Sequence, residues 1–192
     1  MTHEDMRYGY PDERQVVKAP WRSQLRRALW LLAYYTLFKC SLRPMYAWRN
    51  WILRLHGAKI GRGVGIQRSA RIDCPWNLDL GDYTSVGEQA WLYALDKIET
   101  GEFTMMSPRV VLCTGTHDFT IPEMPVVTKP IRIGRGVFLG MDAYIGPGVV
   151  IGENAVIGAR SVVVKDMPAG MICVGHPCRP LKPRLPDDGN KP

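Results

Sequence analysis

A six-residue repeat dominates the stretch from Ile131 to Asp166 and constrains the fold more than any other feature of the sequence. Its most regular place holds an aliphatic residue, at Ile133, Leu139, Ile145, Ile151, Ile157 and Val163. Glycine follows each of the first five of these residues. The fifth place of the blocks holds small or short side chains, at Val137, Ala143, Val149, Ala155 and Ser161. A fixed period of this kind indicates stacked copies of one structural unit.

The period itself indicates the shape of that unit, because it matches neither an α-helix nor the alternation of a single strand. It fits short strands that each end in a corner, so that three blocks complete one triangular coil. We expect the aliphatic side chains to point into the prism. The fourth place is then the corner, where Gly136, Gly148 and Asn154 would tolerate a left-handed backbone conformation best, although Asp142 and Arg160 also occupy it. The sequence therefore predicts an all-β solenoid, a parallel β-helix.

The same phase runs through the earlier part of the chain, from Ile60 onward. Two-residue steps at 78–79 and 98–99 reset it, so each early coil should hold about 20 residues instead of 18, with one enlarged corner. The predicted organisation is a flexible tail (1–20), a basic amphipathic helical segment (21–58), the β-helix (59–168, with a loop excursion at 117–130) and a C-terminal extension (169–192).

The helical segment combines tryptophan, leucine and arginine. From Arg14 to Ile72 the sequence has 13 Lys or Arg residues and no Asp or Glu, although the net charge of the whole chain is only +7. We expect two amphipathic helices, over about residues 23–39 and 45–56, separated by Pro44. The positive charge is therefore a local feature that needs a local explanation.

Three interpretations of these helices remain open. They could cover the open end of the solenoid, whose terminal coil needs a cap. They could contact the inner membrane surface, as basic amphipathic helices do. Alternatively, the arginines could form a solvated face. The longest apolar run, Ala28 to Phe38, has 11 residues, fewer than the roughly 20 that a membrane span needs. We expect no nucleic-acid partner, because no binding motif is present.

Composition limits the compartment. The 192 residues, 46% of them hydrophobic, suffice for one buried core with a small appendage. Five scattered cysteines without metal-type spacing indicate reduced thiols in a cytoplasm-like compartment. The first apolar run begins near residue 28 and follows acidic residues, so we expect no signal peptide. The expected location is cytoplasmic, peripheral at the inner face of the cytoplasmic membrane if the helices bind lipid.

The repeat fails between Leu112 and Ile131, where the sequence reads LCTGTHDFTIPEMPVVTKP. Insertions in a solenoid map to loops, and loops carry function. His117 stands at the root of this insertion, which three prolines stiffen. A histidine side chain ordinarily titrates near pH 6.5, so it can accept a proton at neutral pH. We predict that His117 is a catalytic general base rather than a packing residue.

At these residues the chain resembles the hexapeptide-repeat acetyltransferases. The likeness rests on the repeat, on TGTHD at the root of the insertion, on IGPGVVIGENAVIGARSVVVKDMP, and on VGHPCRPLK. Within that superfamily the chain is most similar to the WcaF-like colanic acid biosynthesis acetyltransferases, through WRNWILRLHGAKIG, PWNLDLGD and LCTGTHDF. The likeness covers about residues 21–183.

The resemblance implies a left-handed parallel β-helix, a homotrimer, and acetyl-CoA bound between adjacent subunits. By position, His117 matches the base that deprotonates the acceptor hydroxyl. Gly140 and Met141 match the coil backbone near the thioester, where an N–H could stabilise the developing oxyanion. The other matched cofactor-binding positions are Ala159, Val164 and Lys165 along the pantetheine and adenine, and Arg179 and Lys182 near the phosphates.

The acceptor side departs from the galactoside and maltose enzymes of that superfamily. Gly87 stands where they have a sugar-contacting asparagine, and Leu95 or Asp96 where they have an acidic contact. We therefore expect a different acceptor. The predicted replacement contacts are Glu88, Trp91, Tyr93 and Asp96.

Taken together, the leading hypothesis is an acetyl-CoA-dependent O-acetyltransferase that acts on a sugar hydroxyl in exopolysaccharide or lipid-linked oligosaccharide biosynthesis. The alternative acceptor is a soluble sugar nucleotide, amino sugar or antibiotic. A remote alternative is a non-catalytic solenoid. We expect no metal, because His117 is the only histidine within the solenoid segment and an open zinc site takes about three protein ligands.

Overall fold

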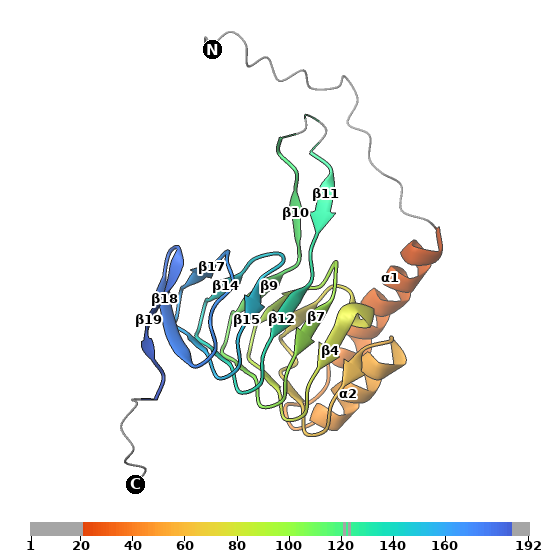
Figure 1. Ribbon diagram of the computed structural model, residues 1–192. Coiled ribbons are helices and arrows are strands. Elements are labelled where there is room, and N and C mark those ends of the chain that lie inside the picture. Colours follow the sequence, from red (N-terminus) through yellow and green to blue (C-terminus); the bar gives the residue numbers. More distant parts are fainter. Residues whose placement is uncertain (1–20, 121, 123, 186–192) are drawn as a thin grey trace.

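The computed structural model describes residues 21–120, 122 and 124–185, which form two N-terminal helices followed by a parallel β-solenoid (Figure 1). The predicted tail, residues 1–20, and the end of the predicted C-terminal extension, residues 186–192, lie outside the described residues. Within the described part, every helix falls short of the length and apolar character that a membrane span requires.

The helical segment begins with one continuous helix and ends with a second. Its elements are α1 (Trp21–Ala33), the π-helix η1 (Tyr34–Phe38) and α2 (Tyr46–Leu55). Trp30, Tyr34 and Phe38 recur every four residues and are buried on one face, where their rings contact one another with centroids 5.6–6.1 Å apart. This apolar face lies against the first coil, so the prediction of an amphipathic helical pair is confirmed.

Three sheets form the walls of the solenoid, and their strands pair in parallel except for β18 and β19, which are antiparallel. The first sheet contains β1 (Lys59–Ile60), β4 (Leu78–Leu80), β7 (Ile98–Thr100), β12 (Ile131–Ile133) and β15 (Val150–Ile151). The second contains β2 (Gly65–Ile66), β5 (Ser85–Val86), β8 (Met105–Met106), β13 (Phe138–Leu139), β16 (Val156–Ile157), β18 (Met171–Gly175) and β19 (Cys178–Pro183). The third contains β3 (Arg71–Ile72), β6 (Trp91–Tyr93), β9 (Val111–Cys113), β14 (Tyr144–Ile145) and β17 (Val162–Val163).

Each coil takes one strand from each sheet, so the described chain contains five complete coils and begins a sixth at β18. Asp79 lies beside Glu99 in the early coils, and Arg132 lies beside Val150 in the late ones, so an early coil is longer than a late coil by two positions. The two additional positions lie at the corner from the third sheet to the first, where the first coil has a short 3-10 helix, η2 (Pro75–Asn77). The predicted enlarged corner is confirmed, as is the left-handed parallel β-helix.

The interior of the prism consists of stacked side chains from consecutive coils. One ladder, along the second sheet, is Ile66, Val86, Met106, Leu139, Ile157 and Cys173, all buried. Burial of each large aliphatic side chain stabilises the fold by about 1.5–3 kcal/mol. Thr100 interrupts the ladder of the first sheet, and its hydroxyl lies 3.3 Å from that of Thr84, which satisfies both polar groups inside the core.

The repeated glycines are required by the close stacking of coils. A Cβ at Gly140 would lie 2.5 Å from the backbone nitrogen of Ala159 in the next coil, closer than any real side chain approaches. The predicted corner places have the expected left-handed backbone, with φ of 65° at Gly136 and 58° even at Arg160. The sequence pattern therefore reports two separate constraints, one on backbone distance and one on backbone conformation.

The helices cap the open edge of the first coil with hydrogen-bond donors. Five side chains donate to its backbone carbonyls: Trp30 to Ile72, Tyr34 to Ala70, Arg49 to Ile66, Asn50 to Val64 and Arg54 to Ile60. These carbonyls belong to the terminal coil of a parallel stack and have no further coil beside them. The cap interpretation is therefore confirmed for the inner face of the helices.

Arg49 is the centre of this cap and is fully buried. Its guanidinium donates to the backbone of Ile66, Leu42 and Arg43 and to the hydroxyl of Ser41, and it lies over the ring of Tyr46. Burial lowers the pKa of Arg49 from its usual range. Because its N–H groups donate hydrogen bonds to neutral acceptors inside the cap, Arg49 has a structural role and is not part of a solvated face.

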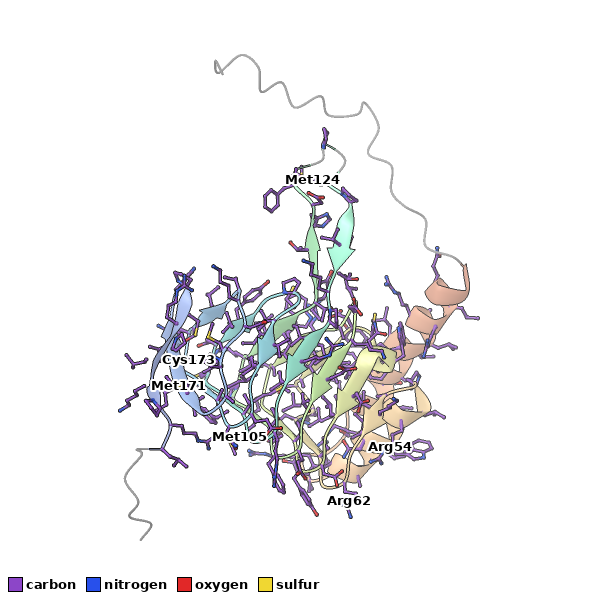
Figure 2. All side chains as sticks on the ribbon, in the orientation of Figure 1. Arg54, Arg62, Met105, Met124, Met171 and Cys173 are labelled. Atoms are coloured by element: carbon purple, nitrogen blue, oxygen red, sulfur yellow. The ribbon has the colours of Figure 1, made fainter. Side chains whose placement is uncertain are left out.

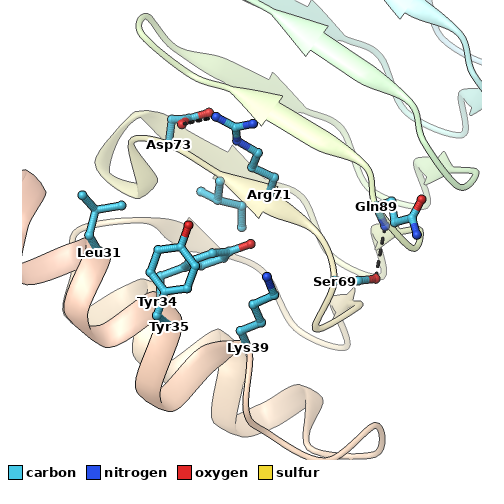
Figure 3. Close-up of a pocket in the computed structure, with 9 residues that line it drawn as sticks. Leu31, Tyr34, Tyr35, Lys39, Ser69, Arg71, Asp73 and Gln89 are labelled. Carbon is cyan, nitrogen blue, oxygen red and sulfur yellow. Dashed lines mark hydrogen bonds and ion pairs between the residues drawn. The ribbon is translucent and has the colours of Figure 1, made fainter.

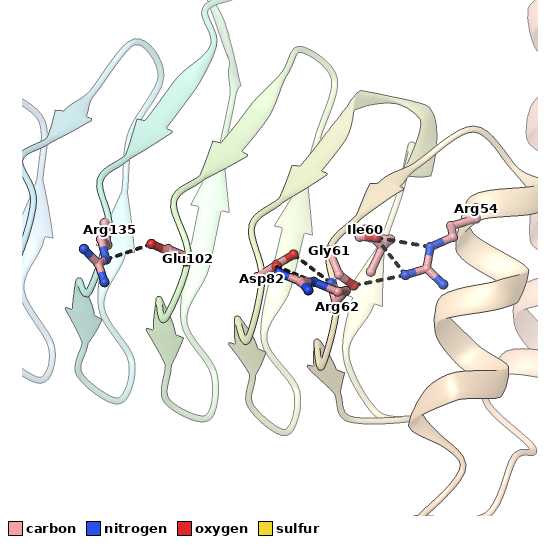
Figure 4. Close-up of polar contacts among 7 residues, drawn as sticks. All are labelled: Arg54, Ile60, Gly61, Arg62, Asp82, Glu102 and Arg135. Carbon is pink, nitrogen blue, oxygen red and sulfur yellow. Dashed lines mark hydrogen bonds and ion pairs between the residues drawn. The ribbon is translucent and has the colours of Figure 1, made fainter.

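Two exposed arginines make further contacts on the outside, one between α2 and the first coil and one between the first and second coils. Arg54 contacts the carbonyls of Ile60 and Gly61, and Arg62 contacts Asp82 of the next coil at 2.8 Å (Figure 4). Exposed ion pairs of this kind contribute little to stability, because water and salt screen the two charges. These exposed contacts add little to the stability of the stacked coils, which comes mainly from the buried ladders of side chains.

Candidate active site

A β-hairpin leaves the solenoid where the repeat is interrupted. It consists of β10 (Gly115–His117) and β11 (Val126–Thr128), antiparallel, with Gly115 beside Thr128 and His117 beside Val126. Figure 1 shows the hairpin standing out from the solenoid between the third and fourth coils, after β9 and before β12. The insertion is therefore an ordered projection, and its first strand ends at His117.

The two faces of the hairpin look toward different coils. A Cβ at Gly115 would lie 2.8 Å from Leu95 and 3.4 Å from Tyr93, and Thr128 donates to the carboxylate of Asp96 at 3.2 Å. Alternate residues of a strand point to opposite sides, so His117 shares the Gly115 face. Thr116 and Val127, on the other face, line a groove against the fourth and fifth coils. His117 is thus on the side of the early coils.

His117 is exposed, and one hydrogen bond orients its ring. Its Nδ1 lies 2.6 Å from the carbonyl oxygen of Met124, near the tip of the hairpin (Figure 2). A carbonyl can only accept, so Nδ1 carries the hydrogen. In the neutral ring Nε2 then has the free lone pair, which is the arrangement that a general base needs.

The turn beyond His117 is held by its own side chains. The hydroxyl and the backbone N–H of Thr120 both donate to one carboxylate oxygen of Asp118, and the Asp118 N–H donates to the Pro125 carbonyl. These bonds from Thr120 lower the pKa of Asp118. His117 is therefore carried on a segment that local hydrogen bonds hold in place.

Aromatic and charged side chains gather on the outer face of the third sheet in the early coils. Trp91 and Tyr93 contact edge to face with centroids 5.4 Å apart, and the guanidinium of Arg71 lies 4.0 Å above the Trp91 ring. The indole N–H of Trp91 donates to Asp73, whose other oxygen lies 3.8 Å from Arg71. Burial raises the pKa of Tyr93, so its phenol stays neutral. An aromatic surface framed by polar groups is suited to a saccharide.

The four predicted acceptor contacts do not form one cluster. Trp91, Tyr93 and Asp96 lie on the early-coil side of the hairpin, and Asp96 is bonded to the hairpin itself. Glu88 lies at the corner between the second and third sheets, 3.9 Å from Arg43 of the turn before α2. The structure thus brings three of the four toward the His117 face and places Glu88 at the opposite edge of the third sheet.

A groove of about 360 Å³ lies on the other face of the hairpin. Its walls are Thr116, Val127 and Lys129 of the hairpin and its root, and Tyr144, Gly146, Pro147 and Val164 of the last two coils. Burial, followed by a hydrogen bond with Cys113, raises the pKa of Tyr144 to about 12. The lining is largely apolar, with one cation, and Val164 from the predicted cofactor set belongs to it.

The predicted cofactor residues occupy two corners of the late coils and the C-terminal hairpin. Gly140 and Met141 stack on Ala159 and Arg160 at the corner before the third sheet, whereas Val164 and Lys165 follow that sheet. The N–H of Gly140 donates to the Ile157 carbonyl at 2.7 Å, so it is already used in the ladder. In the part of the chain that the structure describes, the Met141 N–H has no acceptor.

The two predicted phosphate contacts lie on β19. Arg179 and Lys182 are exposed, and the Arg179 guanidinium donates to the Cys178 carbonyl at 2.8 Å. Neither residue has an ion-pair partner among the described residues. Both cations are thus available to an anionic ligand.

Sequence inspection did not identify Arg71 and Asp73 as part of this site. Once the early coils are stacked in register, both positions follow from Trp91 and Tyr93. Arg71 pairs with Trp91 in the neighbouring coil, and Asp73 occupies the position that corresponds to Tyr93. No group of three or more potential metal ligands occurs among the described residues.

Comparisons with known proteins agree with the repeat and the fold. Residues 130–165 match the family model for the bacterial transferase hexapeptide (six repeats). The chain is 41% identical over 157 residues to "Putative colanic acid biosynthesis acetyltransferase WcaF" of Escherichia coli K12, covering 82% of this chain and 86% of that protein. It is 30% identical over 162 residues to Nodulation protein L of Rhizobium meliloti, covering 81% and 84%.

Solved structures show the same architecture. A maltose O-acetyltransferase from Clostridium difficile 630 superposes with a TM-score of 0.74 at 30% identity, covering 83% of this chain and 87% of that one. A galactoside acetyltransferase in complex with coenzyme A superposes with a TM-score of 0.78 at 23% identity, covering 88% and 85%, and shows the shared fold.

The chain belongs to the hexapeptide-repeat acetyltransferases. It is therefore an acyltransferase, and the relatives it resembles over most of its length include the WcaF acetyltransferases of Escherichia coli and Shigella flexneri.

Proposed function

We propose that this protein transfers an acetyl group from acetyl-CoA to a hydroxyl of a saccharide, with His117 as the general base. The observation that carries the proposal is the bond from His117 Nδ1 to the Met124 carbonyl, which leaves Nε2 free. The His117 side chain is on the hairpin face next to Tyr93 and Asp96, where a saccharide could lie.

In the proposed reaction, His117 Nε2 accepts the proton of the acceptor hydroxyl while the hydroxyl oxygen attacks the thioester carbonyl. The N–H of Met141 stabilises the negative charge that develops on the carbonyl oxygen. A C–O bond forms, the C–S bond breaks, and the protonated His117 returns its proton to the departing thiolate. No other reactant is needed.

The cofactor-binding residues fit acetyl-CoA in chemical type. The groove at Tyr144 and Val164 offers apolar walls for the pantetheine arm, and Arg179 and Lys182 offer cations for the phosphates. Structures similar to this chain have been solved with coenzyme A or acetyl-CoA. Together these features support acetyl-CoA as the cosubstrate.

A homotrimer would complete the site. In one chain the late-coil groove lies on the opposite face of the hairpin from His117, and Met141 and Val164 lie at different corners of the coils. A second copy that places its late coils against the His117 face would bring base, oxyanion donor and cofactor together.

Mixing His117→Ala and Met141→Pro subunits and measuring regained acetyl transfer tests this arrangement. Activity absent from both homogeneous variants and present in the mixture is expected, whereas no recovery from trimers shown to be mixed contradicts it.

The outer face of the helices supports a saccharide presented at a membrane. Ten large apolar side chains are exposed there: Leu25, Leu29, Leu31, Leu32, Tyr35, Leu37, Leu42, Met45, Trp51 and Leu55. A concentration of this kind marks an interaction surface. The sequence around it has no acidic residue between Arg14 and Ile72, which favours an anionic lipid surface over an acidic partner.

Acetyl transfer to different acceptors tests the function directly. We would follow release of free CoA with a panel of free monosaccharides, nucleotide sugars, and lipid-linked saccharides extracted from cells that make an exopolysaccharide. Transfer to the lipid-linked fraction is expected to be fastest. Faster transfer to a nucleotide sugar would establish the soluble acceptor instead, and no transfer to any hydroxyl would refute the proposal.

Vesicle binding tests the membrane surface separately. Leu29→Glu with Leu32→Glu should reduce co-sedimentation with vesicles that contain phosphatidylglycerol. Leu181→Glu with Leu185→Glu is the matched control, since this pair of leucines is more exposed than the first but lies at the other end of the solenoid. Equal binding by both pairs of variants would contradict membrane contact through the helices.

A further inference from the structure

A second hollow, of about 440 Å³, lies between the helices and the first two coils (Figure 3). On the helical side its wall includes Leu31, Tyr35 and Lys39, and on the coil side Ser69, Arg71 and Asp73. The hairpin does not contribute to this hollow, which is therefore separate from the groove beside Val164.

The charges of the hollow favour an anion. Lys39 lies 5.5 Å from the centre of the Tyr35 ring and, among the residues that the structure describes, forms no ion pair. Arg71 lies over Trp91 and has only a 3.8 Å contact with Asp73. Asp73 is in turn occupied by the Trp91 indole. The hollow is thus lined by two cations and by one carboxylate that is already engaged.

The hollow continues toward the candidate active site. Leu31 and Asp73 also line an adjoining space of about 250 Å³, whose further wall is Tyr93 and Leu95. Those two residues contact the position of Gly115 on the hairpin face that carries His117. An extended ligand could therefore lie with one end at Lys39 and the other near His117.

In the opposite direction the hollow adjoins the apolar surface of the helices. Leu31 and Tyr35, which line it, are themselves half exposed, and Leu32 on the neighbouring side of the helix is 64% exposed. A ligand with an anionic group in the hollow could thus extend an apolar chain along the helices. A nucleoside diphosphate shares the anionic group but has no apolar chain that could contact that surface.

We propose that this hollow binds the diphosphate that joins the saccharide acceptor to its lipid, with Lys39 and Arg71 as the cations that hold it. The assignment rests on the proposed function and deepens it by naming the class of acceptor. The diphosphate lies between Lys39 and Arg71, the saccharide extends past Tyr93 toward His117, and the lipid follows the exposed leucines. Charge-assisted contacts with phosphate oxygens provide the recognition.

Binding measured without acetyl transfer tests the proposal independently of the proposed function. One set of neutral phosphatidylcholine vesicles would contain a small fraction of polyprenyl diphosphate. A second set would contain enough phosphatidylglycerol to have the same net charge as the first. We expect preference for the polyprenyl diphosphate vesicles, with about tenfold weaker binding to them for each cation lost in Lys39→Gln and Arg71→Gln. The control, Lys59→Gln with Arg62→Gln, removes two cations of the first coil that do not line the hollow. It should bind like the unaltered protein.

The possible outcomes separate the sources of phosphate. Equal binding to both vesicle types, or equal loss in the control and in the Lys39 and Arg71 variants, would show general attraction to anionic lipid and overturn the proposal. Competition by uridine diphosphate but not by polyprenyl diphosphate would overturn the lipid assignment. If the hollow binds polyprenyl diphosphate while acetyl transfer to saccharides is absent, the proposed reaction fails and the binding site stands.

Discussion

The early and late coils of this solenoid share the same three walls but differ at one corner and in the side chains that they expose. The late coils, from β12 to β17, keep the strict six-residue phase, and the family model matches only residues 130–165. The first two coils, from β1 to β6, are longer because each carries two additional positions at one corner, and the third coil carries the hairpin at that corner. Those corners hold Asp73 and Asp96, which belong to the cluster near the hairpin.

This difference indicates a division of labour between the two halves. A strict repeat offers stacked backbone and short side chains, which suits a ligand that is constant across the family, such as acetyl-CoA. Enlarged corners release side chains from the constraint of stacking, which suits an acceptor that differs among relatives. The hairpin with His117 stands at the boundary, where both ligands would meet.

Replacement of the boundary residue is expected to have the largest effect. His117→Ala should lower acetyl transfer by about 10²–10⁴-fold, because the acceptor hydroxyl loses its general base. His117 is exposed, so the melting temperature should stay unchanged. His176→Ala, at an exposed position of the C-terminal hairpin, is the control and should retain full activity. Full transfer by His117→Ala would remove the boundary from the chemistry.

The cap of the early coils predicts the largest effect on stability. Arg49→Met leaves the carbonyls of Ile66, Leu42 and Arg43 without their donor, and we expect a loss of about 3 kcal/mol in the free energy of unfolding. Arg54→Met, whose side chain is exposed, should cost less than about 1 kcal/mol. Denaturant unfolding at one fixed protein concentration compares them. Equal losses would mean that burial of Arg49 does not matter for the cap.

A smaller effect is expected from the stacking glycines of the late coils. Gly140→Ala places a methyl group 2.5 Å from the Ala159 nitrogen and should cost about 1–3 kcal/mol of folding free energy. At Gly146 the nearest atom is a carbonyl oxygen at 3.3 Å, so Gly146→Ala should cost clearly less. The same unfolding experiment ranks the two variants. A reversed order would contradict backbone distance as the cause of the glycine pattern.

Much of the fold follows from the sequence because the repeat is local. Six-residue spacing determines which side chain enters the prism, and the two-residue steps at 78–79 and 98–99 give the length of the early coils. The cap could be predicted less completely from the sequence. The apolar face of the helices is visible in the sequence, but the match between Arg49 and the carbonyl of Ile66 depends on how the helices dock.

The candidate site was predicted in part for the same reason. His117 stands out because it interrupts a pattern, and Trp91 and Tyr93 are prominent because they are aromatic. Arg71 and Asp73 become visible only when coils are stacked in register. The use of the Gly140 N–H in the ladder, which leaves Met141 as the free donor, likewise depends on the neighbouring coil.

Two-substrate steady-state kinetics of one variant from each half test the division of labour most directly, with the acceptor that the transfer assay identifies. Tyr93→Leu in the early coils should raise the KM of the acceptor about tenfold and leave that of acetyl-CoA unchanged. Val164→Glu, in the late-coil groove, should raise the KM of acetyl-CoA and leave that of the acceptor unchanged. If both variants alter the same constant, the two halves of the solenoid do not serve different ligands.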